Sequence, residues 1–212
     1  MKKIILELKK EVQPYFKYSG GHGFDHVERV YNMAVRIAKE EKADIDVVGI
    51  AALLHDIARH MEDTGGKDVC HAEEGANMAP KILKKYNLPK EKINNIIHCI
   101  RVHRYSLGLK PETKEAEIIQ DADRLDSLGA ICIARVFGYS GEKNRPFHVP
   151  KSRPKKKYAG PSETSINHFF EKILNIKPEN FNTKLARQIA KKRYGFIKVF
   201  VDRFLNEWEG KD

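Results

Sequence analysis

Long apolar stretches, cysteines and strand-like alternation are all scarce in this sequence. No apolar run reaches the roughly 18 residues that a membrane-spanning helix requires. Glu7 and Lys9 interrupt the opening segment where a signal peptide would need an unbroken apolar core. The three cysteines are odd in number and widely spaced, which argues against a disulfide framework or a Cys-x-x-Cys zinc site. We therefore expect a cytoplasmic protein that has buried thiols and no membrane partner.

The composition is that of a folded globular protein. Of the 212 residues, 41% are hydrophobic and 32% are charged, so the chain can bury a core, and we expect a single domain over residues 1–212. The formal net charge of +10 suggests a polyanionic partner, such as nucleic acid or nucleotides, or a solvated lysine surface. Part of the excess lies in "KSRPKKKY" at 151–158, which carries five basic residues in eight, Lys155 among them.

Apolar residues recur at helical spacing along nearly the whole chain, which predicts an all-α fold. Ile4 to Val12 form an amphipathic helix that Pro14 ends, and Asp25 caps a second helix with Glu28 three residues on. Further helices are expected over about 44–61, from a cap at Asp68 to Asn87, through 91–103, over 113–137 with a weak point at 128–130, and over 162–175 and 182–208. The Gly-, Pro- and Lys-rich residues 139–161 are predicted to form a loop or lid.

The stretch "AALLHDIARH" at 51–60 places His55, Asp56 and Arg59 in a segment otherwise suited to a buried helix. Neighbouring helical side chains point about 100° apart, so an ion lying between the two directions could bind both His55 and Asp56. Arg59, one turn further on, would face an anion beside that ion. The alternative is a core histidine with satisfied hydrogen bonds beside an ion-paired aspartate.

Other histidines lie where predicted helices begin or end. His26 begins its helix, with His22 and Arg29 close by, and His71 and His103 stand at the start and end of two others. Histidine is the commonest metal ligand, and a mixed His and Asp set suits Mn, Fe, Ni or Zn and, less well, Mg. His98, in the middle of a helix among isoleucines, is predicted to be a core residue.

A second polar stretch, "IIQDADRLDSLGA" at 118–130, carries three carboxylates in an apolar helix. Asp121 and Asp123 diverge by about 200° on a helix, so they are not expected to bind one ion together. Because an unpaired buried charge is costly, these carboxylates need partners. Either they pair with arginines (Arg124, Arg101 or Arg104), or one of them completes a metal site.

The order His26, His55-Asp56 and Asp123 resembles the H...HD...D signature of the HD-domain phosphohydrolase superfamily. "GHGFDHVERV", "AALLHDIARH", "HAEEGA" and "IIQDADRLD" occur in family order at family-like intervals. The resemblance implies an HD-domain helical bundle that hydrolyses phosphate esters or anhydrides, often of nucleotides. It also implies a divalent cation (Mn, Mg, Ni, Co, Fe or Zn) held by His26, His55, Asp56 and Asp123.

The resemblance implies further roles around that ion. His71 and His103 fall where some relatives hold a second metal, so they are predicted to bind that metal or a phosphate. Asp56 or Asp121 would position the attacking water. The substrate phosphates would be met by Arg29, Arg59, Arg124 and loop lysines such as Lys155, although Arg124 could instead brace the helices.

Two differences from the motifs of known subfamilies argue against particular substrates. Guanosine tetraphosphate hydrolases of this superfamily carry a Glu-Asp pair shortly after the HD dipeptide, whereas Glu62 and Asp63 stand at a longer offset. The GYP motif of the cyclic dinucleotide phosphodiesterases is replaced by "FGYSG" at 137–141.

Three functions remain open from the sequence. The first is a metal-dependent nucleotide phosphohydrolase, either a nucleoside triphosphate pyrophosphatase or a nucleotidase. The second is a nucleic-acid-binding or regulatory module in which the metal is structural and the basic loop engages a polyanion. The third is a di-iron oxygenase of the HD type. The number of ions and the oligomeric state are left open.

Overall fold

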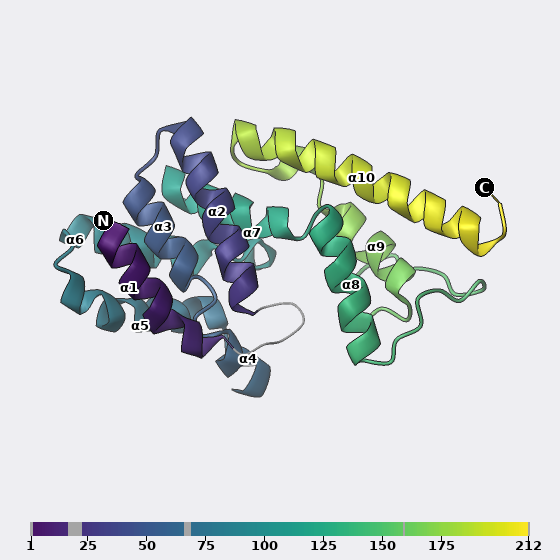
Figure 1. Ribbon diagram of the computed structural model, residues 1–212, viewed down its shortest axis with the longest axis horizontal. Coiled ribbons are helices and arrows are strands. Elements are labelled where there is room, and N and C mark those ends of the chain that lie inside the picture. The colour runs from purple at the N-terminus through teal and green to yellow at the C-terminus, as the bar shows by residue number, and fades with distance from the viewer. Residues whose placement is uncertain (1, 17–22, 66–68, 159, 212) are drawn as a thin grey trace. The chain divides into compact units, whose positions relative to one another are not determined.

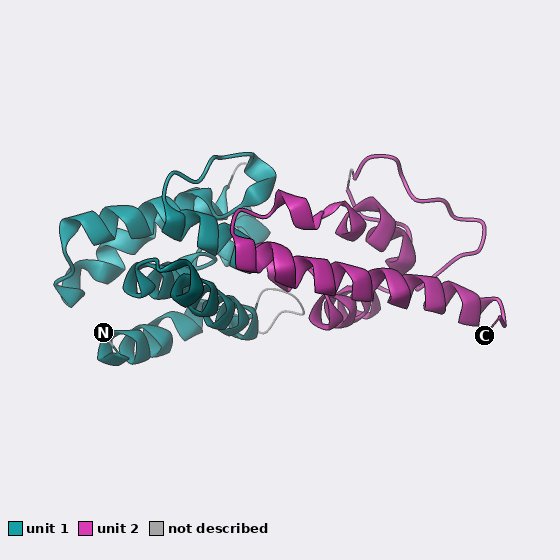
Figure 2. Cartoon of the chain, turned by 90° about the horizontal axis from the view of Figure 1, so that it is seen from above, with its two compact units in different colours: residues 1–123 teal, residues 124–212 magenta. Residues whose placement is uncertain are grey.

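The computed structural model describes residues 2–16, 23–65, 69–158 and 160–211 of the chain. Every regular element in these ranges is a helix, which confirms the predicted all-α class. The chain divides into two compact units, residues 1–123 and 124–212 (Figure 2). Within the described ranges, no helix has the length and apolar character needed to cross a bilayer. The division into two units does not test whether residues 1–212 fold as one domain, so the single domain stays a prediction.

The first unit is built from helices joined by short connections (Figure 1). In chain order they are α1 (Lys2–Val12), η1 (Gln13–Tyr15), α2 (Phe24–Glu41), α3 (Ile45–Leu54), α4 (Arg59–Gly65), α5 (His71–Leu83), η2 (Lys84–Tyr86), α6 (Lys90–Val102), η3 (Tyr105–Leu107) and α7 (Lys114–Asp126), which continues past the boundary between the units.

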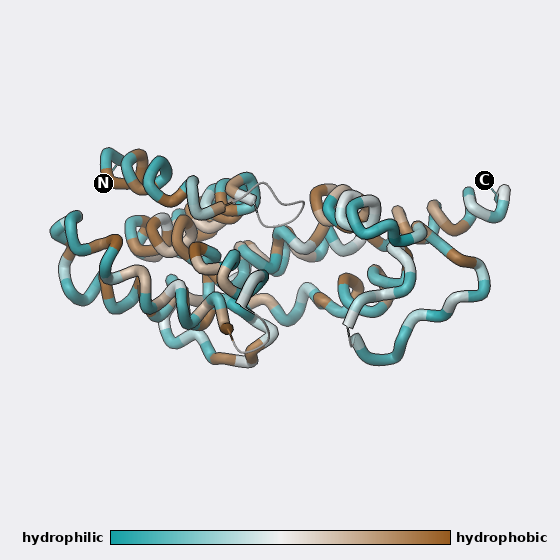
Figure 3. The backbone as a smooth tube through the Cα atoms, turned by 90° about the horizontal axis from the view of Figure 1, so that it is seen from below, coloured by the Kyte–Doolittle hydropathy of each residue, from teal (hydrophilic) through white to brown (hydrophobic). Residues whose placement is uncertain are grey.

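Helix α3 is the centre of the first unit. Residues 47–54 are all buried, and the helix packs against α1, α2 and α6. Asp44 caps its N-terminus by accepting hydrogen bonds from the amides of Asp46 and Val47. Each fully buried Val, Leu or Ile contributes about 1.5–3 kcal/mol. Hydrophobic residues accordingly gather inside this unit (Figure 3). The chain leaves this packed helix directly into His55 and Asp56.

The prediction of one helix over 44–61 is wrong, because α3 ends at Leu54 and α4 begins at Arg59. The His55 ring nitrogen Nδ1 donates to the carbonyl oxygen of Ala52 at 2.8 Å. That carbonyl would otherwise accept only the amide one turn ahead in a continuing helix. The following amides of Ile57 and Arg59 bond to carbonyls three residues back instead. A turn therefore replaces the helix where the polar pair lies.

Two further local predictions are corrected. Gly23, and not Asp25, is the N-cap of α2, and Asp25 lies in the first turn, where it pairs with Arg29 at 2.6 Å. His98 is half-buried rather than a core residue, and its Nε2 accepts the amide hydrogen of Glu112 at 3.0 Å. The predicted cap at Asp68 and the histidine at 22 lie outside the described residues.

The second unit contains α8 (Ala130–Glu142), α9 (Ser165–Glu171), η4 (Ile173–Asn175), η5 (Pro178–Asn180) and α10 (Lys184–Trp208). The predicted weak point at 128–130 separates α7 from α8, where Gly129 has a φ of 87°. A side chain there would also meet Arg193, whose Cγ lies 3.1 Å from the position of a Cβ. Helix α8 extends to Glu142, so the predicted loop starts at Lys143 rather than at 139. The core of the unit is aromatic, and Phe137 contacts the rings of Phe147, Phe169, Phe200 and Phe204.

Candidate metal centre

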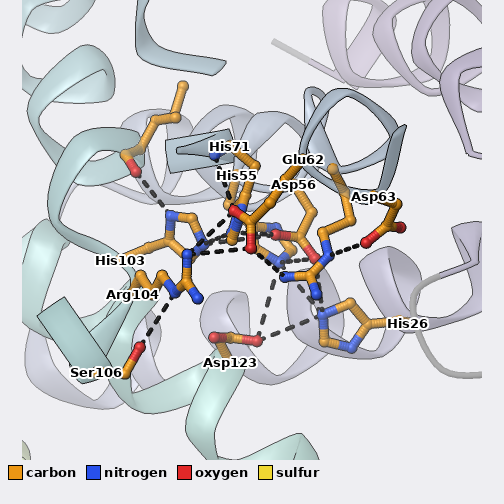
Figure 4. Close-up of polar contacts among 12 residues, drawn as sticks. His26, His55, Asp56, Glu62, Asp63, His71, His103, Arg104, Ser106 and Asp123 are labelled. Atoms are coloured by element: carbon orange, nitrogen blue, oxygen red, sulfur yellow. Dashed lines mark hydrogen bonds and ion pairs between the residues drawn. The ribbon is translucent and has the colours of Figure 1, made fainter. Parts of the chain in front are cut away.

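Four histidines of the first unit lie at helix ends and point toward one another (Figure 4). His26 is in the first turn of α2, and His71 is the first residue of α5. His55 directly follows α3, and His103 directly follows α6. All four are at most 2% exposed. The four buried imidazoles therefore lie close together, and each is positioned by the end of a helix.

The first cluster contains His26, His55 and Asp123. The two Nε2 atoms are 3.3 Å apart. Asp123 Oδ1 lies 3.4 Å from Nε2 of His26 and 4.0 Å from Nε2 of His55. Asp123 reaches the pair from α7, nearly 70 residues further along the chain. The structure thus brings together three of the four residues predicted to hold the first ion.

The second cluster contains Asp56, His71 and His103. Nε2 of His71 and Nε2 of His103 are 3.2 Å apart, and Asp56 Oδ1 lies 3.1 Å and 3.5 Å from them. The other oxygen, Oδ2, lies 3.7 Å from Nε2 of His26 and 3.8 Å from Nε2 of His55. The Asp56 carboxylate therefore faces both clusters, with one oxygen toward each.

The hydrogen bonds of the rings fix where the protons are. Nδ1 of His55 donates to a backbone carbonyl, as does Nδ1 of His103, which bonds to Ile100 at 2.7 Å. Nδ1 of His71 donates to the carboxylate of Glu62. Because carbonyls and carboxylates only accept, each Nδ1 carries the hydrogen, and in the neutral ring the lone pair is on Nε2.

Lone pairs that face each other across 3.2 Å repel unless a proton on one nitrogen, or a metal cation, lies between them. Ligands about 2.1 Å from one ion in tetrahedral or octahedral geometry are about 3.0–3.4 Å apart. The separations of the histidine Nε2 atoms within each cluster fall in this range. The donor set of neutral imidazoles and carboxylates therefore fits divalent cations of the transition series.

The electrostatics of the site favour the ligand forms of His55 and Asp123 and oppose that of His103. Burial lowers the pKa of His55 to about 4, so its ring is neutral at physiological pH. Burial opposes ionisation of Asp123, but His26, His55 and His103 hold its pKa well below the usual range. For His103, burial works against protonation, yet Asp56 and Asp123 raise the pKa of the ring. A cation would displace that proton, since a ring must be deprotonated at Nε2 to bind metal.

Glu62 and Arg104 contact the second cluster, a role that was not predicted for either: Arg104 was weighed as a partner of the α7 carboxylates, and Glu62 as half of a Glu-Asp pair. Glu62 accepts from both Nδ1 and the backbone amide of His71. Arg104 Nη1 bonds to the same carboxylate at 3.0 Å, and Arg59 Nη1 lies 3.9 Å from it. Burial raises the pKa of Glu62, but His71 and Arg104 outweigh this and lower it. The only sequence signal was position, since Arg104 adjoins His103 and Glu62 lies just after the HD dipeptide.

The structure does not bring every predicted residue to the clusters. Asp121 is completely buried on α7 and, among the described residues, belongs to neither cluster. The Cζ atom of Arg124 lies 4.4 Å from the centre of the Phe181 ring, and Nη1 donates to the carbonyl of Asn180. Both contacts are within the second unit and agree with the alternative that Arg124 braces helices. Lys155 also belongs to the second unit. The predicted roles of these residues and of Arg29 in catalysis or phosphate binding stay predictions.

The other arginines proposed as partners for the α7 carboxylates bond elsewhere. Arg101 pairs with Glu73 at 3.0 Å, and Arg104 pairs with Glu62. Asp126 pairs with Arg135 at 2.8 Å. Of the three carboxylates in that stretch, Asp123 is the one that completes a cluster.

Comparison with known proteins agrees with this geometry. The family model of the HD domain matches residues 23–128, a segment that contains all six cluster residues. The YpgQ protein of Bacillus subtilis is 33% identical over 199 residues, which cover 92% of this chain and 88% of that protein. The chain belongs to the HD-domain family.

Solved HD-domain structures resemble this one over nearly their whole length. An HD-superfamily hydrolase from Bacillus thuringiensis superposes with a TM-score of 0.79 at 30% identity and covers 99% of both chains. The crystal structure of Bacillus subtilis YpgQ in complex with ADP superposes with a TM-score of 0.71 at 29% identity and covers 96% of both chains. The HD-domain resemblance therefore extends beyond the matched segment into the second unit, and the chain has the fold of HD-superfamily hydrolases.

Proposed function

We propose that this protein is a divalent-metal-dependent phosphohydrolase that acts on the phosphate ester or anhydride of a nucleotide. One observation carries the proposal: the Asp56 carboxylate lies between two buried histidine pairs and turns one oxygen toward each. Paired metal sites of this kind favour displacement at phosphorus, because both the attacking and the leaving oxygen can be stabilised. The ADP complex of YpgQ supports a nucleotide as the substrate.

The ligands divide between two ions. His26, His55, Asp123 and Asp56 Oδ2 would hold the first ion, and His71, His103 and Asp56 Oδ1 would hold the second. When bound, such ions lower the pKa of a coordinated water and neutralise charge on the phosphoryl oxygens. Asp56, which faces both clusters, would orient the attacking water between them. The Nδ1 bonds to backbone carbonyls keep the His55 and His103 rings in place during the reaction.

Positive charge near the second cluster would bind the substrate. Arg59 and Arg104 lie on either side of Glu62, which they partly neutralise. Guanidinium groups bind phosphate oxygens through paired N–H donors. We therefore place the phosphates of the nucleotide on the side of the centre where Arg59 and Arg104 lie.

A nucleotide screen tests this function. The purified protein is assayed for release of phosphate and of pyrophosphate from nucleoside mono-, di- and triphosphates with Mn, Mg, Co or Ni. Asp56→Asn and His55→Ala are expected to lower kcat/KM at least about 10³-fold, about 4 kcal/mol of transition-state stabilisation. Glu40→Gln, at an exposed carboxylate near the other end of α2 from His26, is the control and is expected to keep its activity.

Full activity in the Asp56→Asn protein would contradict the proposal. Metal analysis of the same preparations counts the ions. Activity that strictly requires iron and oxygen would favour the di-iron oxygenase instead.

A further inference from the structure

The net positive charge is confined to the second unit. Residues 1–123 contain 20 basic and 20 acidic residues, whereas residues 124–212 contain 19 basic and 9 acidic residues. The whole formal charge of +10 therefore belongs to the unit that holds none of the six cluster residues. A charge segregated in this way indicates a polyanionic partner for that unit.

The basic run at 151–157 is held in place rather than loosely tethered. Ser152 Oγ donates to Glu163 at 2.8 Å and accepts from Asn167 Nδ2 at 2.6 Å. The amide of Lys155 donates to Glu171, which also accepts from Ser162 at 2.6 Å. These bonds attach the hydrophilic segment before α9 (Figure 3) to the helix that follows it.

Four cations of this run face solvent. Lys151, Arg153, Lys156 and Lys157 are exposed, and none of them has a carboxylate within 4.0 Å in the described part of the chain. Their positive charge is therefore not neutralised by the protein itself.

Two exposed tyrosines lie among cations in the same unit. Tyr139 on α8 is 44% exposed, and the side chains of Lys143 and Arg145 lie over its ring at 5.6 and 5.2 Å. Tyr158, directly after the basic run, is 45% exposed and has Lys172 over its ring at 5.1 Å. Burial raises the pKa of Tyr158, and Arg145, whose guanidinium lies over the Tyr139 ring, lowers it.

We propose that these side chains form a binding surface for single-stranded nucleic acid. We call it the tyrosine–lysine surface, and it comprises Tyr139, Arg145, Lys151, Arg153, Lys156, Lys157 and Tyr158. Exposed aromatic rings stack with unpaired bases, and cations around them bind the phosphates. A duplex hides its base faces from such rings, whereas a single strand offers them both unpaired bases and phosphates. The combination of rings and unneutralised cations therefore favours a single strand.

This inference goes beyond the proposed hydrolase function and does not depend on it. Binding is measured without turnover, on residues of the second unit only, so failure of one proposal leaves the other standing.

Fluorescence anisotropy with the full-length protein tests the surface. The probes are labelled oligo(U), oligo(dT) and a duplex of mixed sequence, each of about 12 nucleotides or base pairs, at about 50 to 200 mM salt. We expect at least one of the two single strands to bind at least about tenfold more tightly than the duplex, with affinity that falls as salt rises. The comparison of oligo(U) with oligo(dT) identifies RNA or DNA as the preferred strand.

Two sets of variants locate the binding. Replacing Lys151, Arg153, Lys156 and Lys157 by Gln is expected to weaken single-strand binding at least about tenfold at low salt and to reduce the salt slope by about 3, since each phosphate contact contributes about 0.7. The matched control removes the same charge from exposed lysines of the first unit, as Lys10, Lys39, Lys81 and Lys84→Gln, and is expected to bind almost as the wild type does.

A further pair of variants tests whether the tyrosine rings contribute to binding by stacking. Tyr139→Leu with Tyr158→Leu is expected to weaken binding at least about fivefold without changing the salt slope, because stacking is lost and charge is kept. Tyr139→Phe with Tyr158→Phe keeps both rings and is expected to retain the affinity. Circular dichroism confirms that each variant is folded.

Several results would overturn the inference. One is equal binding of duplex and single strand, and another is equal loss in the loop and control quadruple variants. A third is unchanged binding in the folded leucine variant. Absence of single-strand binding at low salt, with or without binding to anionic vesicles or to an acidic protein, would also reject it.

Discussion

At the scale of single residues, Glu62 shows how a side chain outside the ligand set controls a ligand. Its carboxylate fixes the tautomer and the orientation of His71 and is itself held by Arg104. Such outer carboxylates typically contribute 10- to 100-fold in metal affinity. Glu62→Ala is therefore expected to lower the affinity of the second cluster for its ion by about 10- to 100-fold and to leave the affinity of the first cluster unchanged. Calorimetric titration of the metal-free protein with Mn measures both sites.

Glu62→Gln is the control for this prediction. An amide oxygen still accepts the Nδ1 hydrogen of His71, so most of the affinity is expected to return. If Glu62→Ala lowered the affinity for both ions equally, Glu62 would support the fold of the unit as a whole and not His71 in particular.

The side chains of the two clusters could be singled out from the sequence, and the contacts that support them could not. His26, His55, Asp56 and Asp123 were singled out because polar residues interrupt apolar helices in a family-like order. The contact of Glu62 with His71 was not predicted, because it depends on how the chain turns between residues 55 and 71. Distances in space cannot be read from helical spacing across such a turn.

At the scale of elements, the close approach of α5 and α6 depends on Gly75. A Cβ at this position would lie 3.3 Å from Ile100 Cγ2 and 3.6 Å from the carbonyl oxygen of His55. Gly75→Val is therefore expected to destabilise the protein by about 1–3 kcal/mol through overpacking. Urea unfolding, followed by circular dichroism, measures the change. Because the His55 carbonyl is a neighbour, metal affinity is expected to fall as well.

The same substitution at Gly195 is the matched control. Gly195 is also inside a helix, α10, but nothing lies within 4 Å of its Cβ position. Since valine is a slightly better helix former than glycine, Gly195→Val is expected to leave stability unchanged or to raise it slightly. Equal losses at the two positions would mean that helix propensity, and not the approach to α6, is decisive.

Helix α9 carries a histidine whose protonation opposes folding. Burial lowers the pKa of His168 to about 4; Lys172 and Arg145 add to this effect, and Glu171 opposes it. Nδ1 of His168 also lies 3.2 Å from Ser162 Oγ. The unfolded chain takes up the proton first, near pH 6.5, so the stabilising contribution is complete above pH 6.5 and is lost as the pH falls toward 4.

Urea unfolding at several pH values between 7 and 4 measures this loss. The wild-type midpoint is expected to fall over that range by more than the midpoint of His168→Gln, which has no ring to protonate. His60→Gln, at an exposed histidine, is expected to follow the wild type. Parallel pH profiles for the wild type and His168→Gln would show that His168 does not carry the dependence.

Helical periodicity predicted which segments are helices better than where they end. The break at Gly129 was expected because glycine weakens a helix. The end of α3 at Leu54 was not, because apolar spacing continues past it. At that end the His55 ring donates to the carbonyl of Ala52, a contact that leaves no trace in the periodicity.

At the scale of the whole molecule, all six cluster residues belong to the first unit. Metal removal is therefore expected to destabilise residues 1–123 and to leave residues 124–212 unchanged. At 100 to 1,000 times the dissociation constant, a bound ion adds about 3 to 4 kcal/mol to the stability of the unit that holds it. Thermal unfolding with Mn or with a chelator, with proteolysis to identify the unit that opens first, measures the effect.

A chelator effect on the second unit alone would contradict this assignment. An effect on neither unit would show that the histidine lone pairs are satisfied without a cation.

The helix ends that carry the histidines have a consequence for the choice of metal. Helices α2 and α3 form one packed pair, and α5 and α6 form another. Each pair supplies one imidazole from the start of its first helix and one from the end of its second, and the two histidines are 29 and 32 positions apart in the sequence. The two sites are thus pseudo-equivalent halves that share Asp56. They offer nitrogen donors of the same hardness, so both halves should select the same metal, and any difference between them rests on Asp123.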